Sequence, residues 1–165
     1  MKAILNKAMA VFALMFSAVP ITAWATDPLV GTWRLVSWSY EETESKAVSN
    51  PFGDHPSGMQ TFTPDGWFFV VVTDSTRKPP AGPKATDAEA AQLYRTMAAI
   101  AGSYRTEGDK WFEKVEVHSA PAFVGTEVSG TFEIKDDRLQ AKSVPFVSSV
   151  VGKQVVGTFV WERVK

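Results

Sequence analysis

The stretch SGMQTFTPDGWFFVVVT, residues 57–73, decides the fold class. Two runs rich in aromatic and β-branched residues, Ser57–Thr63 and Trp67–Thr73, flank the tripeptide Pro64-Asp65-Gly66. Proline presets φ for a turn, and glycine adopts the positive φ that closes one. The stretch therefore predicts a β-hairpin, and its neighbours on both sides show the same pattern of short apolar runs separated by turn residues.

Six further runs have strand-like composition, which gives about eight strands in all. They are Gly31–Glu42, Ala101–Thr106, Lys110–Ser119, Thr126–Ile134, Leu139–Ser143 and Lys153–Arg163. Tight turns at Glu107-Gly108-Asp109 and Asp136-Asp137 join neighbouring runs. An open sheet would leave two exposed edges, which closure removes. The sequence therefore predicts an all-β fold, an eight-stranded antiparallel up-and-down β-barrel, whose interior is either filled or holds one small ligand.

One short α-helix is expected in the middle of the chain. Residues 74–85 are rich in proline and polar side chains, as in a loop. Thr86-Asp87-Ala88-Glu89 is a capping-box pattern, and apolar residues recur at helical spacing from there to about Ile100. We expect this helix to pack on the barrel or cap one end, and the alternative is a lid over a pocket.

The first 25 residues have the three parts of an export signal. Lys2 and Lys7 form a basic start, residues 8–19 are apolar, and Ala23-Trp24-Ala25 offers small residues to a signal peptidase. We therefore predict a signal peptide at 1–25, a single domain at 26–165, and a periplasmic or secreted location. The apolar run is shorter than the ~20 residues of a membrane span. The chain has no cysteine, so a lipoprotein anchor is excluded.

Composition excludes several function classes. The predicted domain has a net charge of 15 − 18 = −3, because the signal holds two of the 17 basic residues and none of the 18 acidic ones. It has no basic stripe for a nucleic acid. The absence of cysteine removes thiol catalysis and thiolate metal sites. Metal-binding, phosphate-binding and hydrolase motifs are also missing, so we expect no metal and no cofactor.

Several segments in order resemble the bacterial lipocalin-like domain family. Gly31-Thr32-Trp33 is similar to the Gly-x-Trp opening of lipocalins, and Trp161-Glu162-Arg163 ends the last strand. The remaining segments are Asn50-Pro51-Phe52-Gly53, Gly58 with Thr63-Pro64-Asp65-Gly66, Ser103-Tyr104 before Gly108-Asp109, Val115-Glu116-Val117, and Pro121 to Glu127. The resemblance implies a lipocalin-type barrel closed at one end by Gly31, Trp33 and Arg163, with the arginine over the indole in a cation–π contact.

The family resemblance says less about function. Its members are usually single domains of undefined role, and some relatives with similar barrels are isomerases or cyclases. The family pattern often has a histidine just before the Val-Glu-Val segment and an arginine after the Gly-Thr-Glu segment. This chain has Glu113-Lys114 and Ser129-Gly130 there. Any chemistry that relatives perform with those residues therefore does not carry over.

Two histidines are the main polar candidates. Strict alternation places His118 with Lys114 and Glu116, opposite Trp111, Val115 and Val117. His118 is then either a solvated strand end or a polar group at the barrel mouth that orients a ligand or moves a proton. His55 lies in a proline-bounded loop beside Phe52, where binding residues of barrels gather.

The aromatic residues either fill the core or partly line a cavity. The candidate ligand-binding residues are Trp38, Phe52, His55, Trp67, Phe69, Tyr104, His118, Phe123 and Phe132. We favour a protein that binds a small apolar or amphipathic molecule in its barrel. The alternative is an isomerase or cyclase with Glu116, His118 and Tyr104 as catalytic candidates, or a filled barrel that acts as an interaction module. A titratable pair converging in a cavity favours the enzyme.

Overall fold

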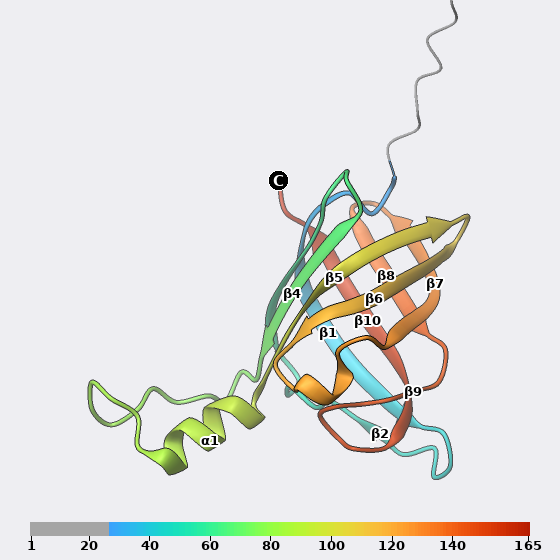
Figure 1. Ribbon diagram of the computed structural model, residues 1–165. Coiled ribbons are helices and arrows are strands. Elements are labelled where there is room, and N and C mark those ends of the chain that lie inside the picture. The colour runs from blue at the N-terminus through green and yellow to red at the C-terminus, as the bar shows by residue number, and fades with distance from the viewer. Residues whose placement is uncertain (1–26) are drawn as a thin grey trace, which may run out of the picture.

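In the computed structural model, which describes residues 27–165, the chain forms a closed antiparallel β-barrel (Figure 1). The barrel strands are β1 Gly31–Glu42, β3 Ser57–Phe62, β4 Trp67–Thr73, β5 Met97–Glu107, β6 Lys110–His118, β7 Glu127–Lys135, β8 Arg138–Ser143 and β10 Gln154–Arg163. The other elements are β2 Val48–Ser49, β9 Phe146–Val147, the helix α1 Asp87–Arg95 and the 3-10 turn η1 Pro121–Phe123. The predicted signal peptide lies outside the described residues.

The strand order confirms the predicted fold. The eight long strands follow one another as β1-β3-β4-β5-β6-β7-β8-β10, and β10 pairs back onto β1. Closure extends along both strands, from Trp33 opposite Arg163 to Glu42 opposite Val155. The two short strands extend the sheet where it passes beyond the barrel, β2 on β1 and β9 on β10.

The helix is shorter than its sequence pattern indicates. It ends at Arg95, and β5 begins at Met97, so the apolar residues up to Ile100 belong to a strand. They pair with β4, where Met97 lies opposite Thr73 and Ile100 opposite Val70. Pairing with an available strand therefore overrides the local preference of this alanine-rich segment for helix.

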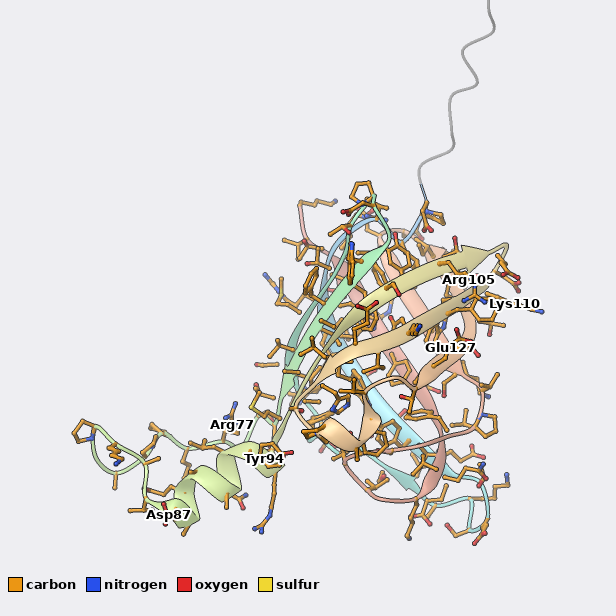
Figure 2. The ribbon with its side chains drawn as sticks, viewed as in Figure 1. Arg77, Asp87, Tyr94, Arg105, Lys110 and Glu127 are labelled. Carbon is orange, nitrogen blue, oxygen red and sulfur yellow. The ribbon has the colours of Figure 1, made fainter. Side chains whose placement is uncertain are left out.

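The prediction that α1 packs on the barrel or caps one end is wrong, and so is the alternative that it forms a lid over a pocket. The capping box forms, with the backbone N–H of Thr86 donating to the Glu89 carboxylate (2.8 Å). None of the helix residues is buried, and the helix stands away from the barrel on an arm between β4 and β5 (Figure 1). At the base of that arm, Arg77 donates to the Leu93 carbonyl and Tyr94 to the Ser119 carbonyl (Figure 2).

A β-bulge in β1 explains why both faces of its sequence carry bulky residues. The pairing with β10 shifts between Leu35 and Ser37, so one residue is skipped and the alternation of side chains reverses. Trp33 before the bulge and Trp38 and Tyr40 after it are therefore all buried in the barrel.

A second bulge changes the end of β6. Val117 pairs with Ala101 and Val115 with Gly102, which leaves Glu116 as the extra residue. Val117 is consequently 63% exposed, so the expectation that it shares the core face with Val115 is wrong. His118 is turned to the interior instead. A Cβ on Gly102 would collide with the carbonyl oxygen of Lys114, so the bulge requires glycine here.

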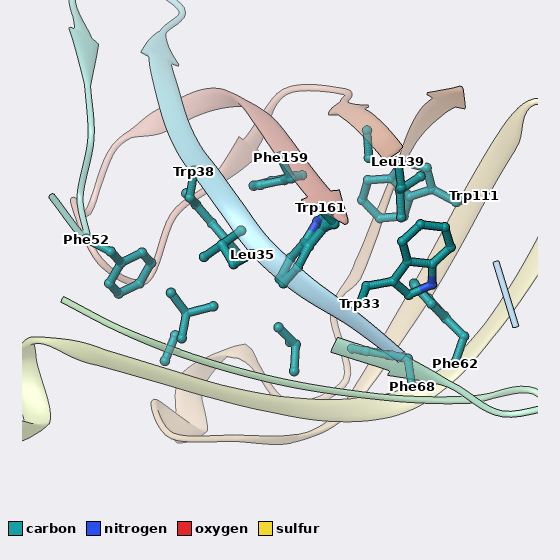
Figure 3. Close-up of a cluster of buried hydrophobic side chains, with 14 of the residues drawn as sticks. Trp33, Leu35, Trp38, Phe52, Phe62, Phe68, Trp111, Leu139, Phe159 and Trp161 are labelled. Carbon is teal, nitrogen blue, oxygen red and sulfur yellow. The ribbon is translucent and has the colours of Figure 1, made fainter. Parts of the chain in front are cut away.

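The core is aromatic and lies along the barrel axis. Trp33, Trp38 and Trp161 lie within one cluster with Phe62 and Phe68 (Figure 3). The Trp38 ring meets two rings of this cluster edge to face, Phe159 with centroids 4.4 Å apart and Trp161 with centroids 6.2 Å apart. Among residues 27–165, no helix has the length and apolar character needed to cross a membrane.

Candidate functional site: a cavity open at one end of the barrel

A cavity of about 380 Å³ lies inside the barrel. All eight long strands contribute to its wall, which is mostly apolar and includes Trp38, Val70, Ile100, Phe132 and Phe159. The volume lies within the range of roughly 300–1,000 Å³ that is usual for small-molecule sites. The barrel interior is therefore only partly filled by its own side chains.

One end of the barrel is closed by Trp33 and Arg163. The Arg163 guanidinium lies over the indole, 4.1 Å from the ring centroid, and donates to the carbonyls of Val30 (2.8 Å) and Pro28 (2.9 Å). The Trp33 indole N–H donates to the Leu29 carbonyl (2.8 Å). These contacts tie residues 28–30 across the barrel end.

Gly31 is part of the same closure. Its φ is +130°, which side chains disfavour, and a Cβ there would lie 2.7 Å from Nη1 of Arg163. The Gly-x-Trp opening thus has a physical reason, because Trp33 provides the ring that Arg163 covers and glycine at position 31 leaves room for the guanidinium.

The opposite end provides the mouth of the cavity. Several wall residues there are exposed to solvent, namely Thr126, Glu127, Pro145 and Val147. They come from the start of β7 and from the connection between β8 and β10, and η1 adds Phe123 from the same end. The solvent-exposed part of the cavity wall therefore lies at the end of the barrel that carries η1 and the loop around β9 (Figure 1).

Glu113 is an acidic side chain on this apolar wall. It faces inward from β6 between Trp111 and Val115, and the side-chain amide of Gln60 donates to its Oε1 (2.9 Å). The residue is half-buried and forms part of the cavity wall. Burial raises the pKa of Glu113 to about 8, and the hydrogen bond from Gln60 offsets this only in part. The carboxyl is therefore mainly protonated at neutral pH.

His118 lies on the wall near the mouth. Its Nδ1 accepts a hydrogen bond from the backbone N–H of Ala120 (2.8 Å), so the neutral imidazole carries its proton on Nε2. Burial lowers the pKa of His118, and its ring lies against Phe123 with centroids 5.5 Å apart. The histidine can thus offer an Nε2–H donor to a ligand in the cavity.

A comparison with known protein families agrees with this architecture. The model of a lipocalin-like domain family matches residues 30–164. The chain belongs to this family. Among solved structures, this lipocalin-like barrel is similar to an uncharacterized protein from Bacteroides eggerthii DSM 20697, with 13% identity, a TM-score of 0.43, and coverage of 82% of this chain and 99% of the other. No curated protein matches.

Four of the nine residues suggested by the sequence as ligand-binding line the cavity of the lipocalin-like barrel. They are Trp38, His118, Phe123 and Phe132. Phe52 is fully buried and packs edge to face on Trp38, with centroids 5.6 Å apart, so it supports the wall without forming it.

The other candidates lie elsewhere. His55 is exposed in its loop, and Trp67 and Phe69 are 40% and 52% exposed on the outside of β4. Glu116 is exposed at the β6 bulge and is not part of the cavity wall. The structure therefore does not bring Glu116 and His118 together.

Tyr104 is at the closed end. Its phenol donates to the Thr63 carbonyl (3.2 Å) and its ring packs on Phe62, with centroids 4.7 Å apart. Burial, together with the negative charges of Asp27 and Asp65, raises the pKa of Tyr104 to about 12. The phenol therefore stays protonated and acts as a structural donor in this geometry.

Sequence reasoning missed Glu113 and Gln60 as site residues. A signal was present for Glu113, because it alternates with Trp111 and Val115 on what the sequence already indicates is a core-facing strand side. Gln60 lies three strands away, and only the closed sheet brings it to Glu113. Within residues 27–165, no three side chains of the metal-binding types come together.

Proposed function

We propose that this protein binds a small, mostly apolar molecule in the barrel cavity and shields it from water. The observation that carries the proposal is the apolar cavity of about 380 Å³, closed by Trp33 and Arg163 and open beside His118 and Phe123. Lipocalin-like barrels in general bind small ligands, and burial of an apolar ligand surface contributes roughly 25 cal/mol per Å². An apolar molecule that fills a cavity of this size therefore gains enough free energy from burial to bind the barrel.

The test uses N-phenylnaphthylamine, a dye that becomes fluorescent in apolar surroundings. Ala98 is 4% exposed and lines the cavity, whereas its neighbour Ala99 lies on the outer side of β5. We expect Ala98→Leu to weaken dye binding about tenfold or more by filling the cavity, and Ala99→Leu to bind as the wild type does. Equal affinity of the two variants, both shown to be folded by circular dichroism, would contradict the proposal.

A second filling variant guards against misfolding of the first. Ala141 lies on the opposite part of the wall in β8 and is also buried, while the adjacent Gln140 is exposed. Ala141→Leu is expected to reproduce the loss of dye binding, and Gln140→Leu to leave it unchanged.

The alternative proposal is an isomerase or cyclase that moves a proton on a bound apolar substrate. It is favoured by the presence of two titratable side chains, Glu113 and His118, on the same cavity wall. The hydrogen bonds favour the carrier, because each of the two side chains has its own partner. Glu113 is bonded to Gln60 and His118 to the Ala120 backbone, and within the described residues no hydrogen bond joins Glu113 to His118. Turnover that disappears in both Glu113→Gln and His118→Phe would establish the enzyme.

We also propose that the protein is exported and that cleavage after Ala25 leaves Thr26 at the N-terminus of the mature domain. The proposal rests on the sequence of residues 1–25. Intact-mass analysis of the protein from the exporting host tests it. A chain retaining residues 1–25 in the cytoplasmic fraction would contradict it.

A further inference from the structure

One polar part of the cavity wall lies at Glu113. This side chain is held on β6 between two apolar inward residues, Trp111 and Val115, and lies opposite Val128 of β7. The 7% exposed Gln60 reaches it from β3 and donates to Oε1. The carboxyl of Glu113 is therefore held in one position by its neighbours on a mostly apolar wall.

No cation faces this carboxyl within the described residues. The titratable groups of the cavity wall besides Glu113 are His118 farther along β6, Tyr40 on β1 and Glu127 at the mouth on β7. Tyr104 pairs with Glu113 from β5 but is not part of the cavity wall. Burial lowers the pKa of His118 and raises those of Tyr40 and Tyr104, so all three are neutral near pH 7.

The nearby basic side chains lie outside the barrel. Arg105 is stacked on Phe112, 3.9 Å from the ring centroid, and pairs with Glu127 across β6 (Figure 2). Lys114 is exposed. An ionised Glu113 would therefore lack a counter-ion, and the neutral acid is the form that the cavity accommodates.

The neutral acid has one hydrogen-bond donor, and the geometry indicates where it lies. Gln60 donates to Oε1, so this oxygen acts as the acceptor and the proton resides on Oε2. No other hydrogen bond to the side-chain carboxyl of Glu113 is present among residues 27–165. The complementary ligand atom is an oxygen with free lone pairs and no charge, since an anion would be buried without a cation.

We propose that Glu113 donates a hydrogen bond from Oε2 to a carbonyl oxygen of the bound molecule, which places the ligand among neutral, mostly apolar carbonyl compounds such as ketones and esters. This inference rests on the proposed function. Gln60 orients the carboxyl, and the apolar wall accommodates the remainder of the ligand. At the mouth, the Nε2–H of His118 offers a second donor to a ligand long enough to reach it.

Three dyes of similar shape test the ligand class. Prodan is a neutral naphthyl ketone whose emission shifts when its carbonyl accepts a hydrogen bond, N-phenylnaphthylamine has no carbonyl, and naphthylmethylamine is a cation at neutral pH. We expect prodan affinity to fall about tenfold between pH 6 and pH 9, because ionisation of Glu113 near pH 8 removes the donor. N-phenylnaphthylamine affinity should change much less.

The variants separate the donor from the charge. Glu113→Gln keeps a donor and cannot ionise, so prodan should bind equally well at both pH values. Glu113→Leu should bind prodan about tenfold more weakly and without the emission shift, yet retain N-phenylnaphthylamine. Glu133→Gln, at an exposed position of β7, is the matched control and should behave as the wild type does.

Each contrary result has a distinct meaning. Prodan binding that is insensitive to both pH and Glu113→Leu would overturn the carbonyl inference and leave the proposed binding function standing. Naphthylmethylamine binding that tightens through pH 8 would overturn it in favour of an amine ligand held by the ionised carboxylate. If neither neutral dye binds the wild type at any pH, the proposed function fails as well.

Discussion

The two ends of the barrel are built on different principles. At the closed end, Trp33 is completely buried, and both its indole N–H and the guanidinium over it have backbone acceptors. At the open end, η1 has no buried residue, and Phe123 and His118 lie half-buried against each other on the cavity wall. One end therefore supports the fold, and the other leaves space for a ligand. Variants at the two ends should accordingly separate stability from binding.

The largest expected effect is at the closed end. Trp33→Ala removes a fully buried indole and the surface on which Arg163 lies, and should lower the free energy of unfolding by about 3–5 kcal/mol. Urea denaturation measures the loss. Trp67→Ala, at a 40% exposed site, is the control and should cost less than about 1 kcal/mol. Similar losses of unfolding free energy in the two variants would show that the closed end contributes no more to stability than an exposed site does.

The carboxyl on the cavity wall should make stability depend on pH. Burial raises the pKa of Glu113 from 4.5 to about 8, so the unfolded chain ionises first, and stability falls as pH rises from about 4.5 to 8 and levels off above that. The free energy of unfolding of Glu113→Gln should match that of the wild type at pH 4 and exceed it by a few kcal/mol at pH 9. This magnitude follows from ~1.4 kcal/mol per pKa unit. Parallel pH profiles for the two proteins would contradict this environment for Glu113.

The β6 bulge shapes the open end of the barrel, because it turns His118 into the cavity. Gly102→Ala places a methyl group against the Lys114 carbonyl and should lower stability by roughly 2–3 kcal/mol while displacing His118. Gly82→Ala, in a loop where the atom nearest to an added Cβ is the Lys84 carbonyl oxygen at 4.0 Å, is the control for the change in residue type. The chemical shifts of the His118 ring report its displacement, and an unchanged ring signal in Gly102→Ala would refute the role of the bulge.

The smallest effect on stability should come from the open end. Phe123→Ala removes a half-buried ring beside His118 and should change the free energy of unfolding by less than about 1 kcal/mol. N-phenylnaphthylamine should nevertheless bind several-fold more weakly, because the ring forms part of the mouth. Val124→Ala changes the next residue, which is 49% exposed and does not line the cavity, and should leave binding unaltered.

Local patterns predicted the closed end and the barrel itself well. The hairpin at residues 57–73, the first strand Gly31–Glu42 and the Trp33–Arg163 pair all depend on residues close in sequence or on a recognised motif. The helix was overextended, because Met97 to Ile100 pair with a strand that is distant in sequence. Pairing with another strand is not visible in helical spacing.

The cavity was harder to predict than the fold, for two physical reasons. Each bulge reverses the alternation of side chains along its strand. No local residue pattern predicts that the strand pairing passes over Val36 or Glu116. The sequence therefore placed Val117 inside and left His118 undecided. The partner of Glu113 is a residue 53 positions away, and only barrel closure brings the two side chains together.

The most direct test of the central claim uses the tryptophans of the chain as reporters. Trp38 and Trp111 line the cavity, and Trp67 is on the outside of the barrel. In a titration with N-phenylnaphthylamine followed by ¹H–¹⁵N NMR, the indole signals of Trp38 and Trp111 should shift together while that of Trp67 stays in place. A shift of Trp67 with unmoved Trp38 and Trp111 would show that the molecule binds the outer face of the sheet, and would contradict ligand binding inside the barrel.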